Sequence, residues 1–357
     1  MKVPNNLPPP PRVLIRCDGA PDIGLGHIVR CIALADELRD GQQCGVKFLT
    51  RRGEVAFRLL EKAGHVVLQP ATHDEPDDAW ISRVIAEEKP DVLVMDFRDP
   101  LSPETVREWR RQGVLTVTID DPEDKRVACD LVFSPPVPQV RRMSWAGFTG
   151  ELKVGWEWVL LRRQFADFKP AAKTNSRPVV LVTMGGSDPA GLTLKAVRAL
   201  DSLDEEFDTV LVVGGAFCHN EALEKLLQGA KRKFEIRRNV ADMAGVMAQA
   251  DLAVASFCVT AYELAAVGVP GIYLCLSDDH AEAAQAFTEA GIGLSLGVHD
   301  QVAEAQLAAS LKKFLGDSAL RAEMSRRSRS LSDGRGAQHV ARNIAQAHTL
   351  KKLQGTS

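Results

Sequence analysis

The sequence has no apolar run long enough to cross a membrane and no signal-peptide core behind its proline-rich first residues. It also lacks an excess of one charge: the formal net charge of its 357 residues is −3, which excludes a global basic field for nucleic acid. The seven cysteines form no C-x-x-C pair and no zinc-ligand spacing. We therefore expect a cytoplasmic protein with reduced cysteines, no metal or cofactor, and neither membrane nor nucleic-acid partners.

What the chain does contain is a regular alternation of short apolar runs and helical patterns, within a composition that is 45% apolar. The pattern predicts strands at 13–15, 46–49, 66–68, 92–95, 115–119 and 131–133, with helices at 27–40, 54–63, 78–88 and 102–112. A second series predicts strands at 179–184, 209–213, 234–236, 251–255 and 271–276, followed by helices at 301–315, 318–331 and 337–351. Such alternation is typical of parallel sheets covered by helices, so the expected fold class is α/β.

We expect the two series to form two Rossmann-like, doubly wound domains. Residues 1–11 are a disordered lead, 12–172 the first domain, 173–335 the second, and 336–357 a C-terminal helix and tail. The stretch 134–176 is rich in loops, and its end at 169–176 is the predicted linker. We expect a monomer or weak dimer.

One stretch near the start carries the strongest chemical signal. The first strand leads into a loop that holds Asp18, Gly24 and Gly26, and a helix then begins beside His27. Glycines let the backbone approach a ligand closely, and a helix N-terminus attracts anions such as phosphate. His27 adds a titratable base. The alternative is an ordinary α/β connection in which His27 is a cap or a surface residue.

A second strand–glycine loop–helix opens the second half, at Met184, Gly185, Gly186 and Ser187. Ser187 or Asp188 is placed to cap the helix, with Pro189 in its first turn. A simple helix start is the competing interpretation. Two such loops would face each other across a cleft if the two sheets pack with their carboxyl edges together.

Further polar residues follow strands of the second half. Ser256, Thr260, Tyr262 and Glu263 come after one strand, and Asp279 and His280 begin a helix after the next. Glu263 in the first turn of its helix could bond ribose hydroxyls. Equally, it could form a capping box with Thr260, three residues earlier.

Acidic residues also end strands of the first half. Asp96 follows the strand at 92–95, and Asp120 and Asp121 follow the strand at 115–119. Ligands of parallel sheets bind outside the carboxyl ends of the strands, so these acids are candidates for ligand contact. For Asp120 and Asp121, which precede Pro122, turn formation is an equally open interpretation.

The first loop does not fit a dinucleotide. Gly24 and Gly26 lack a third glycine at position 29, which is Val29, and they come too late after the strand for a tight Rossmann turn. The second strand ends in Thr50, Arg51 and Arg52, without an acid for a ribose. We therefore discount a nicotinamide dehydrogenase.

Taken together, these motifs resemble the PseG-type nucleotide-sugar hydrolases, two-domain GT-B proteins related to the MurG glycosyltransferases. The resemblance rests on residues 18–30, 184–188 and 262–270, and it extends to 131–133, 154–155, 161–165 and 333–337, nearly the whole chain. Similar sequences are also described as SpsG-like spore-coat polysaccharide proteins.

The resemblance implies release of UDP from a UDP-linked diacetamido-trideoxy sugar by water, on the route to pseudaminic acid. It implies that His27 is the base, that Asp96 is the family's strand-end acid, and that Gly185, Gly186 and Glu263 contact the nucleotide. To the sugar we assign Asp18, Gly24, Gly26, Asp96 and Arg98, and to the nucleotide also Met184, Ser187, Ser256, Thr260, Tyr262, Asp279 and His280. Two departures are Arg98, an aromatic residue in some relatives, and the turn at 256–260, which is Gly-Gly-Ser-Thr in many.

The expected chemistry needs few groups. A nucleoside diphosphate leaves as a stable anion, so an anion site and one base that directs water at C1 suffice. We therefore expect metal-independent, inverting hydrolysis with His27 as the base. The alternatives are a glycosyltransferase that uses a hydroxyl acceptor and a non-catalytic nucleotide-sugar binding protein.

Overall fold

The computed structural model describes residues 10–19, 25–51, 53–72, 74–166, 168 and 177–355. The chain forms two compact units: the first comprises Met1–Pro135, Met143–Leu160 and Gly336–Ser357, and the second comprises Pro136–Arg142 and Leu161–Arg335. The predicted linker at 169–176, most of the predicted lead, and Gly24 lie outside the described residues.

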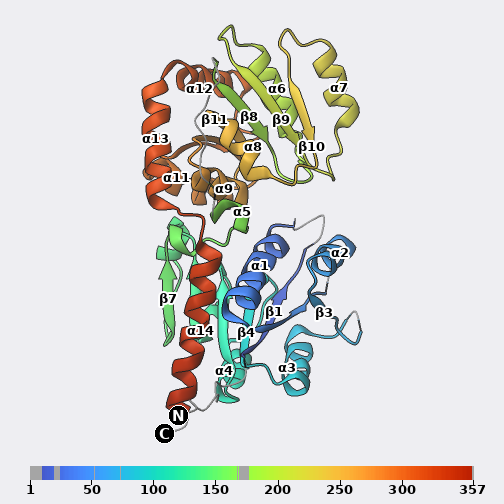
Figure 1. Cartoon of the computed structure of the whole chain (residues 1–357), viewed down its shortest axis with the longest axis vertical. Coiled ribbons are helices and arrows are strands. Elements are labelled where there is room, and N and C mark those ends of the chain that lie inside the picture. Colours follow the sequence, from blue (N-terminus) through green and yellow to red (C-terminus); the bar gives the residue numbers. More distant parts are fainter. Residues whose placement is uncertain are drawn as a thin grey trace, which may run out of the picture. The chain divides into compact units, whose positions relative to one another are not determined.

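The first unit is built on a seven-stranded parallel sheet (Figure 1). In spatial order its strands are β3 (Val66–Leu68), β2 (Gly45–Leu49), β1 (Arg12–Cys17), β4 (Val92–Asp96), β5 (Leu115–Ile119), β6 (Leu131–Ser134) and β7 (Glu151–Val154). The chain runs outward from β1 to β3 and then returns to β4, where Cys17 is paired with Asp96. This reversal is a topological switch point, at which the carboxyl ends of two strands open a place for a ligand.

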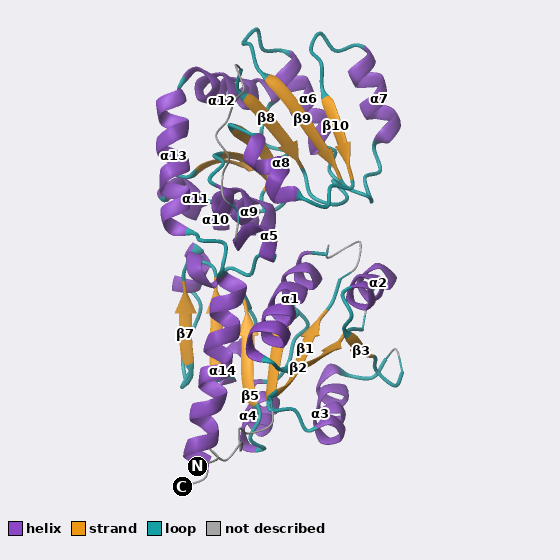
Figure 2. Ribbon diagram, in the orientation of Figure 1, coloured by secondary structure: helices purple, strands orange, loops and turns teal. Residues whose placement is uncertain are grey.

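Helices cover both faces of this sheet (Figure 2). One face carries α1 (Gly26–Asp36), its π-helical continuation η1 (Glu37–Gly41), α2 (Glu54–Lys62) and α14 (Gly336–Gly355), and the other carries α3 (Asp77–Glu88) and α4 (Pro103–Arg111). The strand β1 serves both layers: Val13 and Ile15 pack with α1 and α14, and Leu14 packs with α3 and α4. Successive side chains of a strand point to opposite faces, which explains this division. Two short 3-10 helices, η2 (Asp124–Ala128) and η4 (Trp156–Trp158), complete the unit.

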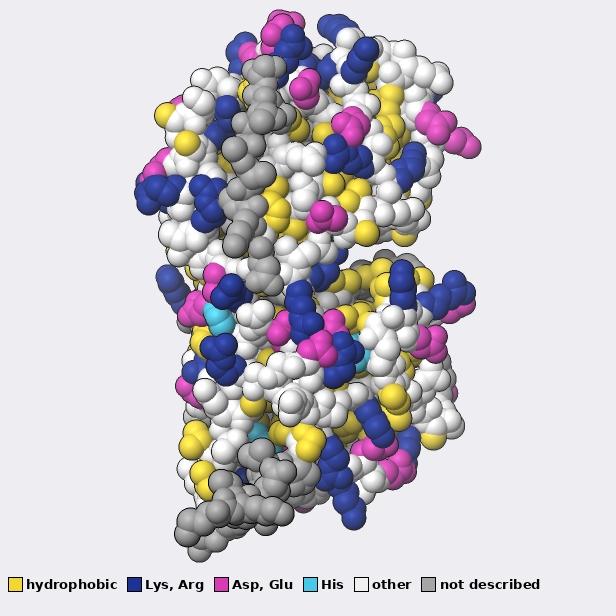
Figure 3. Space-filling view, viewed as in Figure 1, with side chains coloured by type: hydrophobic (Ala, Val, Ile, Leu, Met, Phe, Trp, Pro, Cys, Tyr) yellow, Lys and Arg dark blue, Asp and Glu magenta, His cyan; other side chains and the backbone are white. Residues whose placement is uncertain are grey.

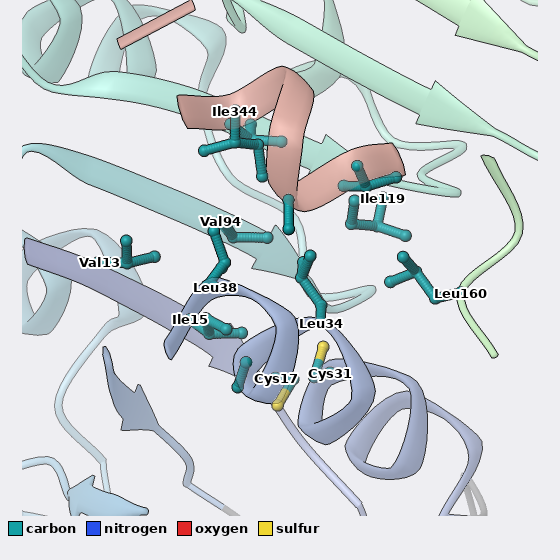
Figure 4. Packing of buried hydrophobic residues seen from close by; sticks show 14 of the residues in the cluster. Val13, Ile15, Cys17, Cys31, Leu34, Leu38, Val94, Ile119, Leu160 and Ile344 are labelled. Carbon is teal, nitrogen blue, oxygen red and sulfur yellow. The ribbon is translucent and has the colours of Figure 1, made fainter. Parts of the chain in front are cut away.

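The C-terminal helix α14 belongs to the core of the first unit, although it comes last in the sequence. Val340 and Ile344 are 0% and 1% exposed, in the same hydrophobic cluster as α1 and β1. Figure 4 shows Ile344 in this cluster with Leu34 and Ile119. The first core is therefore completed only when the end of the chain is in place.

The second unit repeats the arrangement on a six-stranded parallel sheet. Its spatial order is β10 (Glu235–Arg238), β9 (Asp208–Val213), β8 (Val179–Thr183), β11 (Leu252–Ser256), β12 (Gly271–Cys275) and β13 (Gly293–Val298), so its switch point lies between β8 and β11. Its helices are η3 (Pro138–Arg141), α5 (Arg163–Ala166), α6 (Leu192–Asp201), α7 (Asn220–Gln228), α8 (Met243–Gln249), α9 (Val259–Val267), α10 (Asp278–Ala283), α11 (Gln285–Glu289), α12 (Glu304–Gly316) and α13 (Ser318–Leu331).

The predicted class, two parallel α/β sheets of Rossmann type, is confirmed. Two strands were not predicted. The edge strand β7 lies in the stretch expected to be rich in loops, and its four residues contain no apolar run. The strand β13 begins with Gly293 and contains Gly297, which weakens its sequence signal. Both strands form because they pair with a neighbour, β6 and β12 respectively.

Charges of both signs are mixed on the surface. Figure 3 shows Lys and Arg interspersed with Asp and Glu over the described residues of both units on the face drawn. In the part of the chain that the structure describes, no helix combines the length and the apolar character needed to traverse a bilayer.

Replacing Ile344 by alanine tests whether α14 stabilises the first unit. We expect the free energy of unfolding to fall by about 3 kcal/mol, because the change leaves a cavity in a closed core. Leu353→Ala, on the same helix at a side chain that is 63% exposed, is the matched control and should change it by less than about 0.5 kcal/mol. Urea unfolding measures both, and equal effects of the two variants would contradict the packing.

Candidate functional site

His27 and Asp96 meet at the switch point of the first sheet. His27 is the second residue of α1 and Asp96 is the last residue of β4. Nδ1 of His27 lies 2.7 Å from Oδ1 of Asp96, and the two side chains are 20% and 1% exposed. An ionised carboxylate only accepts hydrogen bonds, so Nδ1 carries the proton and Nε2 is the accepting nitrogen. Among the described residues Nε2 has no hydrogen-bond partner.

Arg30, one turn further along α1, binds the same carboxylate with two nitrogens. Its Nε lies 2.7 Å from Oδ2 of Asp96 and its Nη2 lies 2.5 Å from Oδ1. Its Nη1 lies 3.1 Å from Oδ2 of Asp120. Burial opposes ionisation of Asp96, but the charge of Arg30 and the hydrogen bonds from Arg30 and His27 hold the pKa of Asp96 well below its usual range. Asp96 is therefore an anion near neutral pH.

The two acids that follow β5 have different roles. Asp121 is buried against Lys125 with a 3.1 Å ion pair and accepts the backbone N–H of Glu123, so it forms the turn. Asp120 has a positive φ of 48° and pairs with Arg30, which joins it to the His27 cluster. Of the two interpretations left open, turn formation is confirmed for Asp121. Asp120 belongs to the His27 cluster, and its contact with a ligand stays a prediction.

Arg98 lies at the solvent side of this cluster. Its Nη2 is 3.5 Å from Oδ2 of Asp120, and its side chain is 46% exposed. A guanidinium has five N–H donors, so this single long contact leaves most of them available. The predicted role of Arg98 as a sugar contact stays a prediction.

Asp18 has contacts of another kind. Its carboxylate lies 2.7 Å from Nη1 of Arg16 and accepts the backbone N–H of Arg51 at 2.8 Å. Arg16 is itself buried against the rings of Trp80 and Phe97. These contacts join the loop after β1 to the end of β2, and a sugar contact by Asp18 stays a prediction. Gly26 is the first residue of α1 and is exposed.

In the second unit, two glycine loops meet at the carboxyl edge of the sheet. The loop after β8 contains Gly185, with φ of 79°, and a Cβ at Gly185 or Gly186 would meet nothing within 4 Å. A Cβ on Gly214, after β9, would lie 2.3 Å from the carbonyl oxygen of Gly186. The two backbones are therefore in contact, with the first loop facing open space. Gly214 and Gly215 were not predicted as site residues, although they follow a predicted strand as Gly185 and Gly186 do.

The start of α6 differs in part from the prediction. Asp188 accepts the backbone N–H groups of Leu192 and Thr193, both at 2.8 Å, so capping by Asp188 is confirmed. Pro189 precedes the helix, which begins at Leu192, so its predicted place in the first turn is wrong. Because the carboxylate of Asp188 occupies these two amides, an anion here would bind the loop backbone of 185–187 instead.

Glu263 lies in the second turn of α9, not in the first as predicted. Its Oε1 accepts from Arg162, at 2.7 Å from Nη2 and 3.2 Å from Nε, and Oε2 accepts no hydrogen bond from the described residues. Burial raises the pKa of Glu263, and Arg162 opposes this effect. The capping-box alternative is wrong, because Cys258 is the N-cap residue and Thr260 is already helical. In the sequence, Arg162 has no signal beyond the family resemblance at 161–165, because its pairing with Glu263 depends on the tertiary fold.

The remaining predicted nucleotide contacts lie around the same edge. Ser256 is the buried last residue of β11, and Met184 is buried directly after β8. Asp279 and His280 are in the first turn of α10, so the predicted helix start is confirmed. The Ser277 hydroxyl caps this helix by accepting the backbone N–H of His280. The ring of Tyr262 packs in an aromatic cluster, 4.9 Å from the ring of Phe287 and 6.2 Å from that of Phe257. The described residues contain no group of three or more metal-ligating side chains.

Comparison with known proteins identifies related sequences. Residues 179–345 match the family model described as the glycosyltransferase family 28 C-terminal domain. The chain is 27% identical over 327 residues to the spore coat polysaccharide biosynthesis protein SpsG of Bacillus subtilis, covering 90% of this chain and 94% of SpsG. It is 24% identical over 234 residues to the UDP-2,4-diacetamido-2,4,6-trideoxy-beta-L-altropyranose hydrolase of Campylobacter jejuni, covering 63% of this chain and 77% of that protein.

Solved structures show the same architecture. MurG of Acinetobacter baumannii superposes with a TM-score of 0.70 at 18% identity, over 95% of this chain and 100% of MurG. The chain has a GT-B fold. Another GT-B structure, Anabaena HepE in complex with UDP-glucose, superposes with a TM-score of 0.59 at 15% identity, over 94% of this chain and 100% of HepE. At these identities the likeness concerns the fold alone, and it confirms the expected GT-B class.

Replacing Asp96 by asparagine tests the ion cluster of this GT-B chain. Because the variant leaves Arg30 without its main partner, we expect the free energy of unfolding near neutral pH to fall by about 3 kcal/mol. The folded-state pKa of Asp96 lies below its usual 3.8, so this stabilisation is present above 3.8 and is lost as the pH falls through the folded-state pKa. The difference between wild type and variant should therefore shrink on acidification.

Denaturant unfolding from pH 7 down to pH 3 measures this difference. Asp300→Asn, at an exposed carboxylate, is the control and should follow the wild type throughout. A gap between wild type and Asp96→Asn that widens in acid would contradict the ionised, paired state of Asp96.

Proposed function

We propose that this protein is a nucleotide-sugar hydrolase, which cleaves the anomeric C1–O bond of a UDP-linked diacetamido-trideoxy sugar with water and releases UDP and free sugar. The observation that carries the proposal is the His27–Asp96 pair, an imidazole whose Nδ1 lies 2.7 Å from a buried carboxylate and whose Nε2 is left to accept a proton. Similarity to the C. jejuni hydrolase supports this substrate class.

In the proposed reaction His27 is the general base. Nε2 takes a proton from water while the water oxygen forms a bond to C1 on the face opposite the leaving group, and UDP departs with the electron pair of the C1–O bond. Direct displacement inverts C1. Asp96 orients the ring and stabilises the imidazolium that forms, without itself taking the proton. A diphosphate leaves as a stable anion, so the step needs no general acid and no metal.

The structure favours different roles for the predicted sugar-side residues. Asp96 is 1% exposed and bound to His27 and Arg30, which supports an orienting role instead of direct contact with the sugar. Arg98 and Asp120 are the more exposed members of the cluster, at 46% and 30%. We propose that these two contact the sugar, together with Gly26, which precedes the base at the start of α1. A sugar contact by Gly24, outside the described residues, stays a prediction.

We propose that the second unit binds UDP. The open backbone at 185–187 would hold the diphosphate, and Oε2 of Glu263, which the described residues leave free, would accept the ribose hydroxyls. Ser256 and Thr260 lie beside Glu263 at the switch point, with Met184, Tyr262, Asp279 and His280 at the same edge. The UDP-glucose in the HepE structure supports UDP as the nucleotide. The names of the two relatives support a place in surface-polysaccharide or nonulosonic acid biosynthesis.

A glycosyltransferase is the second candidate, favoured by the family 28 match over residues 179–345. Incubation with the UDP-sugar alone separates the candidates, with proton NMR following the anomeric signal and UDP together. We expect UDP and free sugar in equal amounts, the first product being the inverted anomer, with no acceleration by added hydroxyl acceptors. Release of UDP only when an acceptor is present would identify a transferase. A ligand-induced rise in Tm without product would identify a binding protein.

Two variants separate the base from the nucleotide site. His27→Asn should lower kcat by about 10³-fold and leave the Kd for UDP within about twofold, because it removes only the proton acceptor. Glu263→Gln should raise the Kd for UDP about tenfold, because it removes a charged acceptor. Glu289→Gln, at an exposed carboxylate on α11, should change neither value. Wild-type turnover by His27→Asn, measured beside calorimetric UDP binding, would refute the assignment of the base.

A further inference from the structure

The carboxylate of Asp96 accepts hydrogen bonds from two residues that the proposed chemistry does not use. Oδ1 is 2.7 Å from Nδ1 of His27 and 2.5 Å from Nη2 of Arg30. Oδ2 is 2.7 Å from Nε of Arg30 and accepts from the Cys31 thiol at 3.2 Å. An ionised carboxylate has about four acceptor sites. All four are therefore occupied, three of them by Arg30 and Cys31.

We infer that Arg30 is a positioning residue that keeps the His27 base uncharged, by holding the Asp96 carboxylate and sharing its negative charge, and that Cys31 assists by occupying the last acceptor site. The catalytic consequence rests on the proposed function. The charge state of His27 does not depend on the proposed function, because it is a property of the free protein.

The contacts of His27 determine which of its ring nitrogens carries the proton. Nη2 of Arg30 lies 3.1 Å from Nδ1, so in principle it could donate to an unprotonated Nδ1. That arrangement would place the lone pair of Nδ1 against Oδ1 of Asp96 at 2.7 Å, which is repulsive. Since Arg30 already donates to Oδ1 and Oδ2, the favourable arrangement keeps the proton on Nδ1 and leaves Nε2 as the acceptor.

The charges near His27 affect whether its ring binds a second proton. A carboxylate alone beside an imidazole favours the imidazolium, which cannot act as a base. Here the groups in contact with His27 are Asp96 from β4 and Arg30 from α1. Arg30 also pairs with Asp120 in the turn after β5, and Asp120 pairs with Arg98. Two carboxylates are matched by two guanidiniums. The charge of Arg30, 3.1 Å from the ring, therefore offsets much of the attraction that Asp96 has for a second proton on His27.

Cys31 follows Arg30 on α1 and is fully buried. Burial, together with the neighbouring Cys17, raises the pKa of the Cys31 thiol well above its usual value, so it remains an S–H donor. Figure 4 shows the sulfur atoms of Cys17 and Cys31 beside each other under α1. A thiol is a weak donor, so we expect Cys31 to contribute less than Arg30.

The test is a pH titration of the His27 ring in the ligand-free full chain, by NMR with ¹⁵N-labelled histidine and with His27→Asn for assignment. In the wild type we expect a neutral ring with its proton on Nδ1. Arg30→Gln should move the titration midpoint upward by about one pH unit, because a positive charge is lost. Arg30→Lys, which keeps the charge but not the planar fork, should stay near the wild-type midpoint. Asp120→Asn, which removes a negative charge, should move it downward.

Activity provides the second measurement. In Arg30→Gln the acid limb of kcat/KM should move upward with the NMR midpoint, a change that a purely structural role would not produce. Arg30→Lys should lose about tenfold in kcat, since the carboxylate is held less well. Cys31→Ala should lose about twofold to threefold, with partial recovery in Cys31→Ser. The controls are Arg107→Gln, whose side chain is 43% exposed, and Cys44→Ala, which removes a buried thiol elsewhere in the same core.

The outcomes separate this inference from the proposed function. Midpoints that shift as expected in a protein without hydrolase activity would overturn the function and leave the inference standing. Hydrolysis with an unchanged midpoint in Arg30→Gln, or a wild-type ring with its proton on Nε2, would overturn the inference. If Arg30→Gln does not fold, the downward shift in Asp120→Asn decides, because that side chain is 30% exposed and its loss leaves the Arg30–Asp96 pair in place.

Discussion

A buried carboxylate must find compensating charge and hydrogen bonds, and this requirement on Asp96 organises the site of the first unit. Asp96 ends the central strand β4, so it can be satisfied only by groups that reach the carboxyl edge of the sheet. Arg30 and His27 reach it from α1, and Arg30 also binds Asp120 after β5. The Asp96 carboxylate therefore joins β4 to α1, and Arg30 extends the cluster to the turn after β5. The imidazole is oriented as part of the same arrangement.

The position of this cluster follows from the topology of the sheet. Where the strand order reverses, the connections after two neighbouring strands leave in opposite directions, and the edge between them stays open. Both sheets have this reversal beside their first strand, between β1 and β4 and between β8 and β11. In each unit, residues at or after the carboxyl ends of these two strands supply the candidate groups. His27 and Asp96 do so in the first unit, and the loop at 185–187 with Glu263 in the second.

The second unit shows that a glycine loop before a helix is not by itself an open anion site. At α6 the first free amides are capped by Asp188, so the open backbone is in the loop. At α9 the N-cap residue Cys258 makes no side-chain capping bond. This difference matters for a diphosphate, because backbone amides that already donate to a carboxylate are not available to donate hydrogen bonds to it. The cost of burying Glu263 is likewise offset within the unit, by Arg162.

The sequence by itself determined the class of fold and the positions of most strands, because apolar runs at alternating spacing report burial directly. It also located His27, Asp96 and the loop at 185–187, since glycines and acids after a strand must lie at the carboxyl edge. Its errors were local: the edge strand β7, the start of α6 and the turn of α9 that carries Glu263. These three features depend on strand-pairing and helix-capping partners that lie outside any short stretch of sequence around them.

Only the tertiary structure decided which of these residues act together. Arg30 and Asp96 are 66 positions apart, Arg162 and Glu263 are 101 apart, and α14 joins a core whose first strand is at the other end of the chain. It also distinguished Asp120 from Asp121, which are adjacent and chemically identical, by the single fact that one carboxylate faces Arg30 and the other Lys125. Periodicity reports which face of an element is buried, whereas charge pairing depends on which elements the folded sheet makes neighbours.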